Sequence, residues 1–237
     1  MHCYTKGEVI DKKVCYPNKS VQERTPVTVM FDGEVADRFL TPHFKNFRGI
    51  SGKSSLANLI GIAVPLSIPP DPMHLIDLGL VKYFVECWLG NITHFIKELL
   101  TKEQITSLNQ ILCNLHVPVE FSRSPRSFED VSKWKADELK DFAIYFFPIM
   151  DAFMEVTYFK HFILFVQAYR ILSGTTITIQ KFRRAEKLMN LFTTKLEQFY
   201  GKRIFTIKVH NVCYHMLDFV RTKYVFWTPG SVVCKEI

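Results

Sequence analysis

The chain has 237 residues, of which 48% are hydrophobic and 14% aromatic, and it carries a formal net charge of +7. This composition excludes a disordered tail, because a chain of this length can bury about 70% of its unfolded surface in a core. The positive charge favours an anionic partner such as DNA but does not require one. No basic segment followed by an apolar one opens the sequence, so we expect an intracellular protein, nuclear or cytoplasmic, and not a secreted one.

The first 72 residues are predicted to be irregular, because seven prolines interrupt every periodic pattern there. Short strands are predicted at Lys13–Tyr16 and Pro26–Phe31. No membrane partner is expected, because the most apolar stretch, Met73–Leu89, contains three charged residues and is interpreted as a buried amphipathic helix.

Apolar residues recur at helical spacing from Met73 onward. Thr101 and Gln104 have the spacing of a capping box, and Gly201 is placed to end a helix. The predicted helices cover Met73–Leu89, the residues after Thr101, a short turn from Ser127, Ala136–Phe147 ending near Pro148, Glu155–Leu172, Ile179–Tyr200 and Ile207–Arg221. Glu155–Leu172 is apolar nearly all round and is predicted to be the central core helix. The predicted fold class is therefore mainly α, a helical bundle-like domain with an irregular N-terminal segment.

Gly52-Lys53-Ser54 has the ending of a phosphate-binding loop. Such a loop needs a glycine five residues before Gly52, and that position holds Phe47. A polar turn is therefore predicted here. The acidic residues lie in first turns or on polar helix faces, where helix dipole and solvation explain them, so no catalytic residues are assigned.

His210 and His215 lie five residues apart on one predicted helix, with Cys213 between them. Five positions separate two side chains by about 140° on a regular helix, whereas helical histidine ligands are usually four positions apart. A zinc site here would require a bent or frayed helix.

Several ordered blocks of the sequence resemble a known family. Ile68-Pro69-Pro70-Asp71-Pro72-Met73-His74 with the following Leu78-Gly79 is similar to the PPD-x-MH…LG signature of CACTA (En/Spm)-type transposases and their domesticated relatives. Further blocks similar to that family are Cys3–Glu8, Glu23-Arg24-Thr25, Gly49–Leu56, Ser122–Ser127, Trp134–Leu139, Tyr158–Leu164, Phe199-Tyr200-Gly201 and Val209–Met216. In the family signature the matching positions are Pro70, Asp71, Met73, His74 and Gly79.

The resemblance implies a DDE-type transposase with an RNase H-like core, whose acidic triad holds two divalent metals, and a large helical insertion before the last acid. The region resembled is that insertion and its flanks. The first two catalytic aspartates would precede Met1, and Glu236 lies one position from the expected last acid in a dissimilar context. We therefore expect no enzyme activity from this chain alone.

The resemblance also implies a zinc site built from a CxxC pair and two histidines. Here the metal ligands would be Cys3, His210 and His215. Three ligands predict a weak or empty zinc site. No other cofactor is expected.

These features predict a transposon-derived fragment associated with DNA. Its domains are expected to be residues 1–72, a remnant of the transposase core flank, residues 73–223, the helical insertion, and a divergent tail, residues 224–237. The expected phosphate contacts are Lys181, Arg183, Arg184 and Lys187, although a solvated helix face also accounts for them. Partners other than DNA would be a second copy or an intact transposase. The alternative function is a domesticated helical protein-interaction module without DNA binding.

Overall fold

The computed structural model describes residues 3–19, 22–39, 41, 45–59, 62–65, 67–68, 70–92, 99–121, 123–223 and 232–234. The chain is mainly α-helical, as predicted, and forms two compact units. Unit 1 comprises Met1–Glu8 and Lys19–Pro70, and unit 2 comprises Val9–Asn18 and Asp71–Ile237.

Unit 1 contains helix α1 (Pro26–Phe39) and a 3-10 turn, η1 (Ser55–Asn58). The prediction of a strand at Pro26–Phe31 is wrong, because these residues form the start of α1. Proline is well suited to the first helical position, and Thr25 and Thr28 exchange hydrogen bonds, Thr25 N to Thr28 Oγ1 at 2.9 Å and Thr28 N to Thr25 Oγ1 at 3.2 Å. This reciprocal cap overrides the strand preference of the β-branched residues that follow.

A β-hairpin precedes the helices of unit 2. Strand β1 (Glu8–Ile10) pairs with β2 (Lys13–Cys15), in agreement with the strand predicted from Lys13. The two connecting residues, Asp11 and Lys12, have positive φ angles of 44° and 66°, as the tight turn of a hairpin requires. Beyond β2, the backbone N–H of Tyr16 donates to the carbonyl of Phe205 at 2.8 Å and joins the hairpin to the helical core.

The helix predicted at Met73–Leu89 forms, but with two different pitches. Its first part is a π-helix, η2 (Met73–Val81), which continues as α2 (Lys82–Trp88). Apolar spacing alone does not distinguish the two pitches. None of the described helices combines the length and apolarity needed to cross a membrane.

The middle of unit 2 has shorter elements. They are α3 (Lys102–Cys113), the 3-10 helix η3 (Phe128–Lys133), α4 (Ala136–Asp141), the π-helix η4 (Phe142–Phe146) and the 3-10 helix η5 (Phe147–Ala152). The predicted capping box is present, with Thr101 N to Gln104 Oε1 at 2.8 Å. The helix predicted to end near Pro148 instead continues with altered pitch, since a proline in the first turn of η5 needs no backbone donor.

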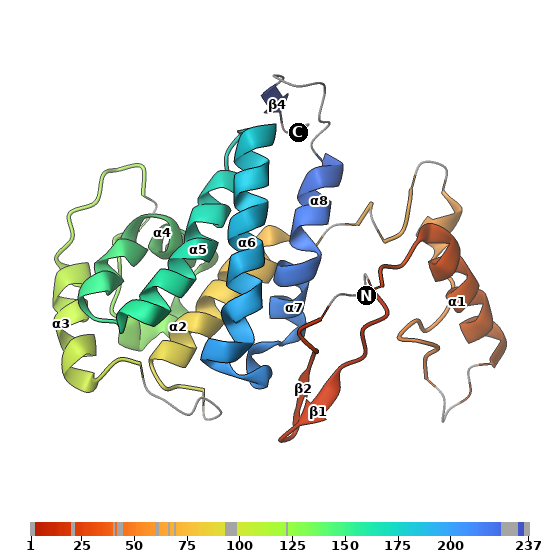
Figure 1. Ribbon diagram of the computed structural model, residues 1–237, viewed down its shortest axis with the longest axis horizontal. Helices are drawn as coiled ribbons and strands as arrows, with labels where there is room; N and C mark the ends of the chain where they lie inside the picture. Colours follow the sequence, from red (N-terminus) through yellow and green to blue (C-terminus); the bar gives the residue numbers. More distant parts are fainter. Residues whose placement is uncertain are drawn as a thin grey trace. The chain divides into compact units, whose positions relative to one another are not determined.

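Helices α5 (Val156–Leu172) and α6 (Ile179–Tyr200) have the predicted bounds to within one residue and pack side by side (Figure 1). The core of unit 2 is aromatic, with the ring centroid of Phe162 4.8 Å from Trp88, 4.9 Å from Phe147 and 5.1 Å from Phe84. Edge-on and tilted ring pairs of this kind stabilise a core beyond their buried area. Strand β3 (Thr176–Thr178), between α5 and α6, pairs antiparallel with β4 (Val232–Cys234).

The last predicted helix, Ile207–Arg221, is two helices. A 3-10 turn, η6 (Lys202–Ile204), precedes α7 (Ile207–Tyr214), and α8 (Met216–Lys223) follows. The break falls at His215, whose φ of −121° and ψ of −22° are not helical. The prediction of one continuous helix is therefore wrong at the position of the second histidine.

Candidate functional site

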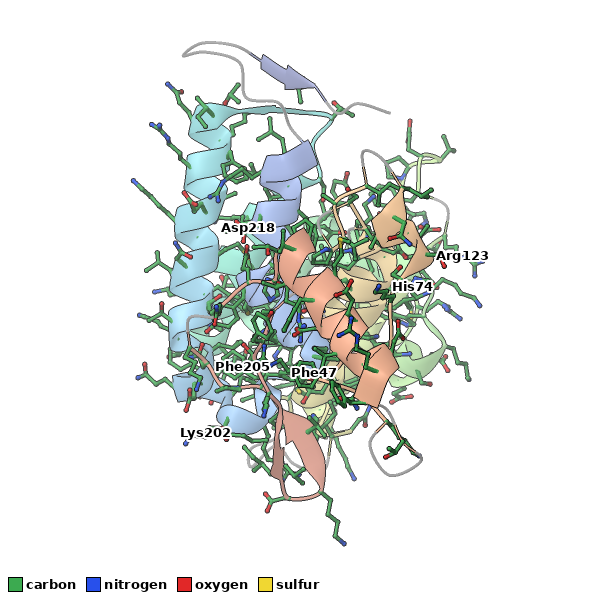
Figure 2. The ribbon with its side chains drawn as sticks, turned by 90° about the vertical axis from the view of Figure 1, so that its right-hand side faces the viewer. Phe47, His74, Arg123, Lys202, Phe205 and Asp218 are labelled. Atoms are coloured by element: carbon green, nitrogen blue, oxygen red, sulfur yellow. The ribbon has the colours of Figure 1, made fainter. Side chains whose placement is uncertain are left out.

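The residues that resemble the family signature, Pro70 to Gly79, lead into η2 and continue along it. Asp71 caps this helix, because its carboxylate accepts the backbone N–H groups of Met73 and His74 at 3.2 and 3.3 Å. The same carboxylate lies 2.5 Å from Nδ1 of His74, whose side chain is 68% exposed and is labelled in Figure 2. The bond from His74 lowers the pKa of Asp71. Asp71 and His74 therefore form an exposed carboxylate–imidazole pair, and Pro70 immediately precedes it.

Gly79 of the signature is a packing residue of η2. A Cβ atom at this position would lie 2.8 Å from the carbonyl oxygen of His74 and 2.9 Å from Cδ of Lys208 on α7. The π-helix brings the carbonyl of residue 74 under residue 79, so only glycine leaves room. The sequence motif gives no sign of this close approach.

Asp77 is a carboxyl group that the sequence patterns did not single out. It lies within η2 at 5% exposure, and the hydroxyl of Tyr169 on α5 donates to its Oδ1 at 2.7 Å. Burial raises the pKa of Asp77 to about 6, against the bond from Tyr169 and the charge of Lys140. The nearby carboxylates of Asp137 and Asp71 raise it further.

Another resembling block has an architectural function. The guanidinium of Arg126 makes two bonds to the carboxylate of Glu138 on α4, at 2.6 and 2.7 Å. The indole of Trp134 donates to the carbonyl of Ser127 at 3.1 Å. These bonds connect the Arg-containing and Trp-containing parts of the block. Both parts therefore have a structural role, and no catalytic role is needed to account for them.

The break at His215 changes the relation between the two predicted metal ligands of unit 2. The ring centroids of His210 and His215 lie 5.3 Å apart, which a continuous helix with side chains about 140° apart would not allow. Burial lowers the pKa of His210 to about 4, and burial also lowers the pKa of His215. Burial thus favours the neutral form of both imidazoles, the form in which histidine binds zinc. The two residues fit as two zinc ligands.

The third predicted ligand, Cys3, belongs to unit 1. Its backbone carbonyl accepts a bond from Nε of Arg24 at 3.1 Å, and Cys3 forms a β-bridge with Glu23. The prediction that its thiolate is a metal ligand stays a prediction.

The Gly52-Lys53-Ser54 segment is a turn over the C-terminal part of α1. The Lys53 backbone N–H faces both carboxylate oxygens of Asp37 at 3.2 and 3.3 Å, and its ammonium lies 3.0 Å from Glu34. Carboxylates thus bind both the backbone N–H and the ammonium of Lys53, the groups that a phosphate-binding loop would offer to a phosphate.

Two arginines of unit 1 share one buried carboxylate. Nη1 of Arg24 lies 2.7 Å from Oδ2 of Asp32, and Nη1 of Arg48 lies 3.4 Å from Oδ1. Arg24 is buried at 3% exposure, whereas the side chain of Arg48 is 53% exposed. Arg48 has a left-handed φ of 50°, which costs a non-glycine residue roughly 1 kcal/mol. Sequence reasoning missed this pair, since the two arginines are 24 positions apart in a segment predicted to be irregular.

The predicted phosphate contacts gather on one element. Lys181, Arg183, Arg184 and Lys187 are all exposed and lie in the first half of α6. Their directions span an arc of about 160° around a regular helix. In Figure 2 several side chains that end in nitrogen project outward from this part of α6, the pale cyan helix. Within the described residues none of the four joins an ion pair.

Glu236, which lies one position from the expected last acid and is not assigned as catalytic, lies outside the described residues. Comparison with protein-family models, with curated proteins and with solved structures finds no match to this chain.

Proposed function

We propose that this chain is a transposase-derived helical domain that associates with DNA and does not cut DNA by itself. The ordered sequence blocks support the origin. The observation that carries the DNA association is the cluster of four exposed basic residues at the N-terminal end of α6, Lys181, Arg183, Arg184 and Lys187.

One member of this cluster, Lys181, has a position that is unfavourable for helix stability. A helix N-terminus carries a partial positive charge, and a cation in its first turn costs about 0.3–1 kcal/mol, whereas an acidic residue there would stabilise the helix. The first turn of α6 contains no acidic residue. The ammonium of Lys181 and the helix dipole therefore add to one positive field, which favours a phosphate group.

Strand cleavage by the mechanism that the resemblance implies needs three carboxylates around two divalent metals. No acidic residue of this chain is assigned to such a role, because the acids lie in first turns or on polar helix faces. We therefore propose that the contribution of this chain to transposition is to position DNA or a partner.

Binding to a labelled random-sequence duplex across a salt series tests the DNA association. We expect binding at low salt whose logarithm falls linearly with the logarithm of salt concentration. Replacing Lys181, Arg183, Arg184 and Lys187 by glutamine should weaken binding by at least about tenfold and reduce the salt slope.

A matched control replaces four exposed lysines on other elements by glutamine. These are Lys102, Lys140, Lys160 and Lys202. Both variants lose the same charge, so equal losses of affinity would contradict a site on α6. A folded wild-type chain that does not bind duplex at low salt would contradict the DNA association itself.

Zinc binding is the second part of the proposal. We expect His210 and His215 to bind zinc weakly, with the Cys3 thiolate as the further ligand that the sequence resemblance implies. Titration of the apo chain against a colorimetric chelator measures the affinity. The substitution His215→Asn should abolish binding, and an unchanged affinity in Cys3→Ser would contradict the assignment of Cys3.

The alternative of a protein-interaction module is favoured by one observation. Helix α1 exposes Val27 at 75%, Met30 at 41% and Phe31 at 58%, residues that share a helix face at three- and four-residue spacing. A second copy or an intact transposase could cover this face. Light scattering of the wild type and of the double variant Val27→Ser, Phe31→Ser, together with the duplex titration, distinguishes the two functions. Self-association that the double variant loses, in a folded wild type that does not bind duplex at low salt, favours the module.

A further inference from the structure

A cleft of about 1050 Å³ lies within unit 1. It is lined by Tyr4, Thr5, Lys6, Gly7, Gln22, Arg24, Thr28, Asn46, Phe47, Arg48 and Gly49. Its size is at the upper end of the range of about 300–1,000 Å³ that is typical of small-ligand sites. All of these lining residues belong to unit 1, whereas α6, which carries the proposed duplex contacts, belongs to unit 2.

The charge of this cleft is positive. Three of the lining residues are basic, Lys6, Arg24 and Arg48, and none of the described lining residues is acidic. The buried carboxylate of Asp32, behind this lining, pairs with both guanidiniums. The described lining thus contributes three cationic side chains and no anionic one, which favours an anionic ligand.

Aromatic rings accompany these charges. The guanidinium of Arg48 lies 5.0 Å from the ring centroid of Phe47 and 5.7 Å from that of Tyr4, and the guanidinium of Arg24 lies 4.3 Å from Tyr4. Both rings are half-buried in the cleft wall. Aromatic rings beside guanidinium planes are the surfaces on which nucleobases stack.

The backbone holds Arg48 in place. Phe47 N donates to the carbonyl of Ile50 at 2.8 Å and Ile50 N to that of Phe47 at 2.9 Å, which closes a two-residue turn. The central residues, Arg48 and Gly49, have φ angles of 50° and 83°, as a tight hairpin turn requires. Nη2 of Arg24 also donates to the carbonyl of Arg48. A charged residue thus occupies a left-handed position that glycine or asparagine would fill with less strain.

We propose that this cleft binds an unpaired nucleotide of single-stranded DNA, with Arg48 and Lys6 at the phosphate and Tyr4 and Phe47 against the base. The identity of the ligand as DNA rests on the proposed function. A paired base is covered on both faces by its neighbours and cannot reach the rings, whereas an unpaired base can. An acidic peptide would satisfy the charges and leave the rings without a stacking partner.

Fluorescence anisotropy with a labelled oligothymidylate of about eight nucleotides tests this site. The substitution Arg48→Asn removes the charge and suits the left-handed backbone, and we expect it to weaken binding by about tenfold or more. Phe47→Leu removes a ring and should weaken binding by at least about fivefold. Circular dichroism confirms that each variant is folded.

Lys12→Asn is the matched control, since Lys12 is also basic, exposed and left-handed, with φ of 66°, and lies outside the cleft. Its affinity for the oligothymidylate should equal that of the wild type. Equal affinity of wild type, Arg48→Asn and Phe47→Leu would overturn the proposal, as would a folded wild type that does not bind the oligothymidylate at low salt.

The duplex experiment separates this proposal from the proposed function. Duplex binding that depends on α6, together with no oligothymidylate binding, would overturn the cleft alone. Oligothymidylate binding that depends on Arg48, without duplex binding, would support the cleft and contradict duplex association. A matched acidic oligopeptide that competes as well as the oligothymidylate would overturn the nucleotide as ligand.

Discussion

Asp77 is a buried carboxyl group whose charge opposes folding at neutral pH. Its pKa of about 6 in the folded chain exceeds its ordinary value of 3.8. The protonated form is therefore favoured in the fold, so its stabilising contribution is fully present below pH 3.8 and is lost as pH rises through 6. The shift corresponds to about 3 kcal/mol at pH 7.

The substitution Asp77→Asn should remove this cost, because an amide oxygen can still accept the bond from Tyr169. We expect the variant to be about 1–3 kcal/mol more stable than the wild type at pH 7 and equally stable near pH 4. Urea unfolding at the two pH values measures the difference. A variant less stable than the wild type at pH 7 would show that the carboxylate has a favourable partner there.

The close packing at Gly79 predicts a steric effect. Gly79→Ala should destabilise unit 2 by about 1–3 kcal/mol, because the added Cβ meets a backbone carbonyl that cannot move without distorting η2. Gly174→Ala is the comparison, since there the nearest atom, the carbonyl oxygen of Ile171, is 3.3 Å from the added Cβ. Thermal melts should rank Gly79→Ala as the less stable of the two.

At the scale of elements, α5 and α6 are joined by a buried histidine. Nε2 of His161 lies 2.9 Å from the carbonyl of Phe192, and its ring stacks on that of Phe192 with centroids 4.7 Å apart. Burial lowers the pKa of His161 to about 4, against the bond to Phe192. The neutral form is therefore favoured in the fold, and its stabilising contribution is present above pH 6.5 and is lost as pH falls through 4.

The substitution His161→Gln retains a donor for the Phe192 carbonyl and removes the titration. We expect the stability of the wild type to fall by about 3 kcal/mol more than that of the variant between pH 7 and pH 4. Guanidinium unfolding followed by tryptophan fluorescence measures both. Parallel pH profiles of the two proteins would show that His161 is not the titrating group.

At the first turn of α6, the residue that favours duplex binding is expected to lower the stability of the fold. Lys181→Glu places a negative charge in the first turn and should stabilise the chain by about 0.3–1 kcal/mol at low salt. The same change should weaken duplex binding, because the new carboxylate would repel the phosphate that Lys181 is proposed to contact. Melting temperature and duplex affinity together test this, and a loss of both would contradict the dipole argument.

At the scale of the whole molecule, each of the two units is formed by two separate stretches of the chain. The hairpin residues Val9–Asn18 belong to the helical unit, although residues 19–70 of unit 1 follow them. Their contacts in unit 2 include an ion pair of Asp11 with Arg203 at 2.8 Å and the bond from Tyr214 to Asn18 at 2.5 Å.

A chain that begins at Asp71 should therefore melt below the 237-residue chain, by at least about 5 °C, because each kcal/mol lost corresponds to about 2–4 °C at this size. A matched chain keeps Val9–Asn18 and replaces residues 19–70 by a Gly/Ser linker. It should recover most of the difference. Equal melting temperatures for the two shortened chains would show that the hairpin does not stabilise the helical unit.

The sequence by itself determined the helical class and most helix bounds of unit 2. The capping box at Thr101, the apolar periodicity of Val156–Leu172 and the glycine at position 201 act within a few residues, so local pattern reports them directly. The same reasoning failed at Pro26–Phe31, where a reciprocal threonine cap outweighs β-branched residues.

Only the tertiary structure decided the sites. The burial of Asp77 beside Tyr169 and the sharing of Asp32 by Arg24 and Arg48 depend on residues separated in the sequence. The break at His215 leaves no sign in the apolar spacing of the helix. Sequence spacing describes directions around one regular helix, whereas burial and charge at a site are sums over neighbours from several elements. Where packing changes the pitch of a helix or breaks it, the directions that spacing predicts no longer hold.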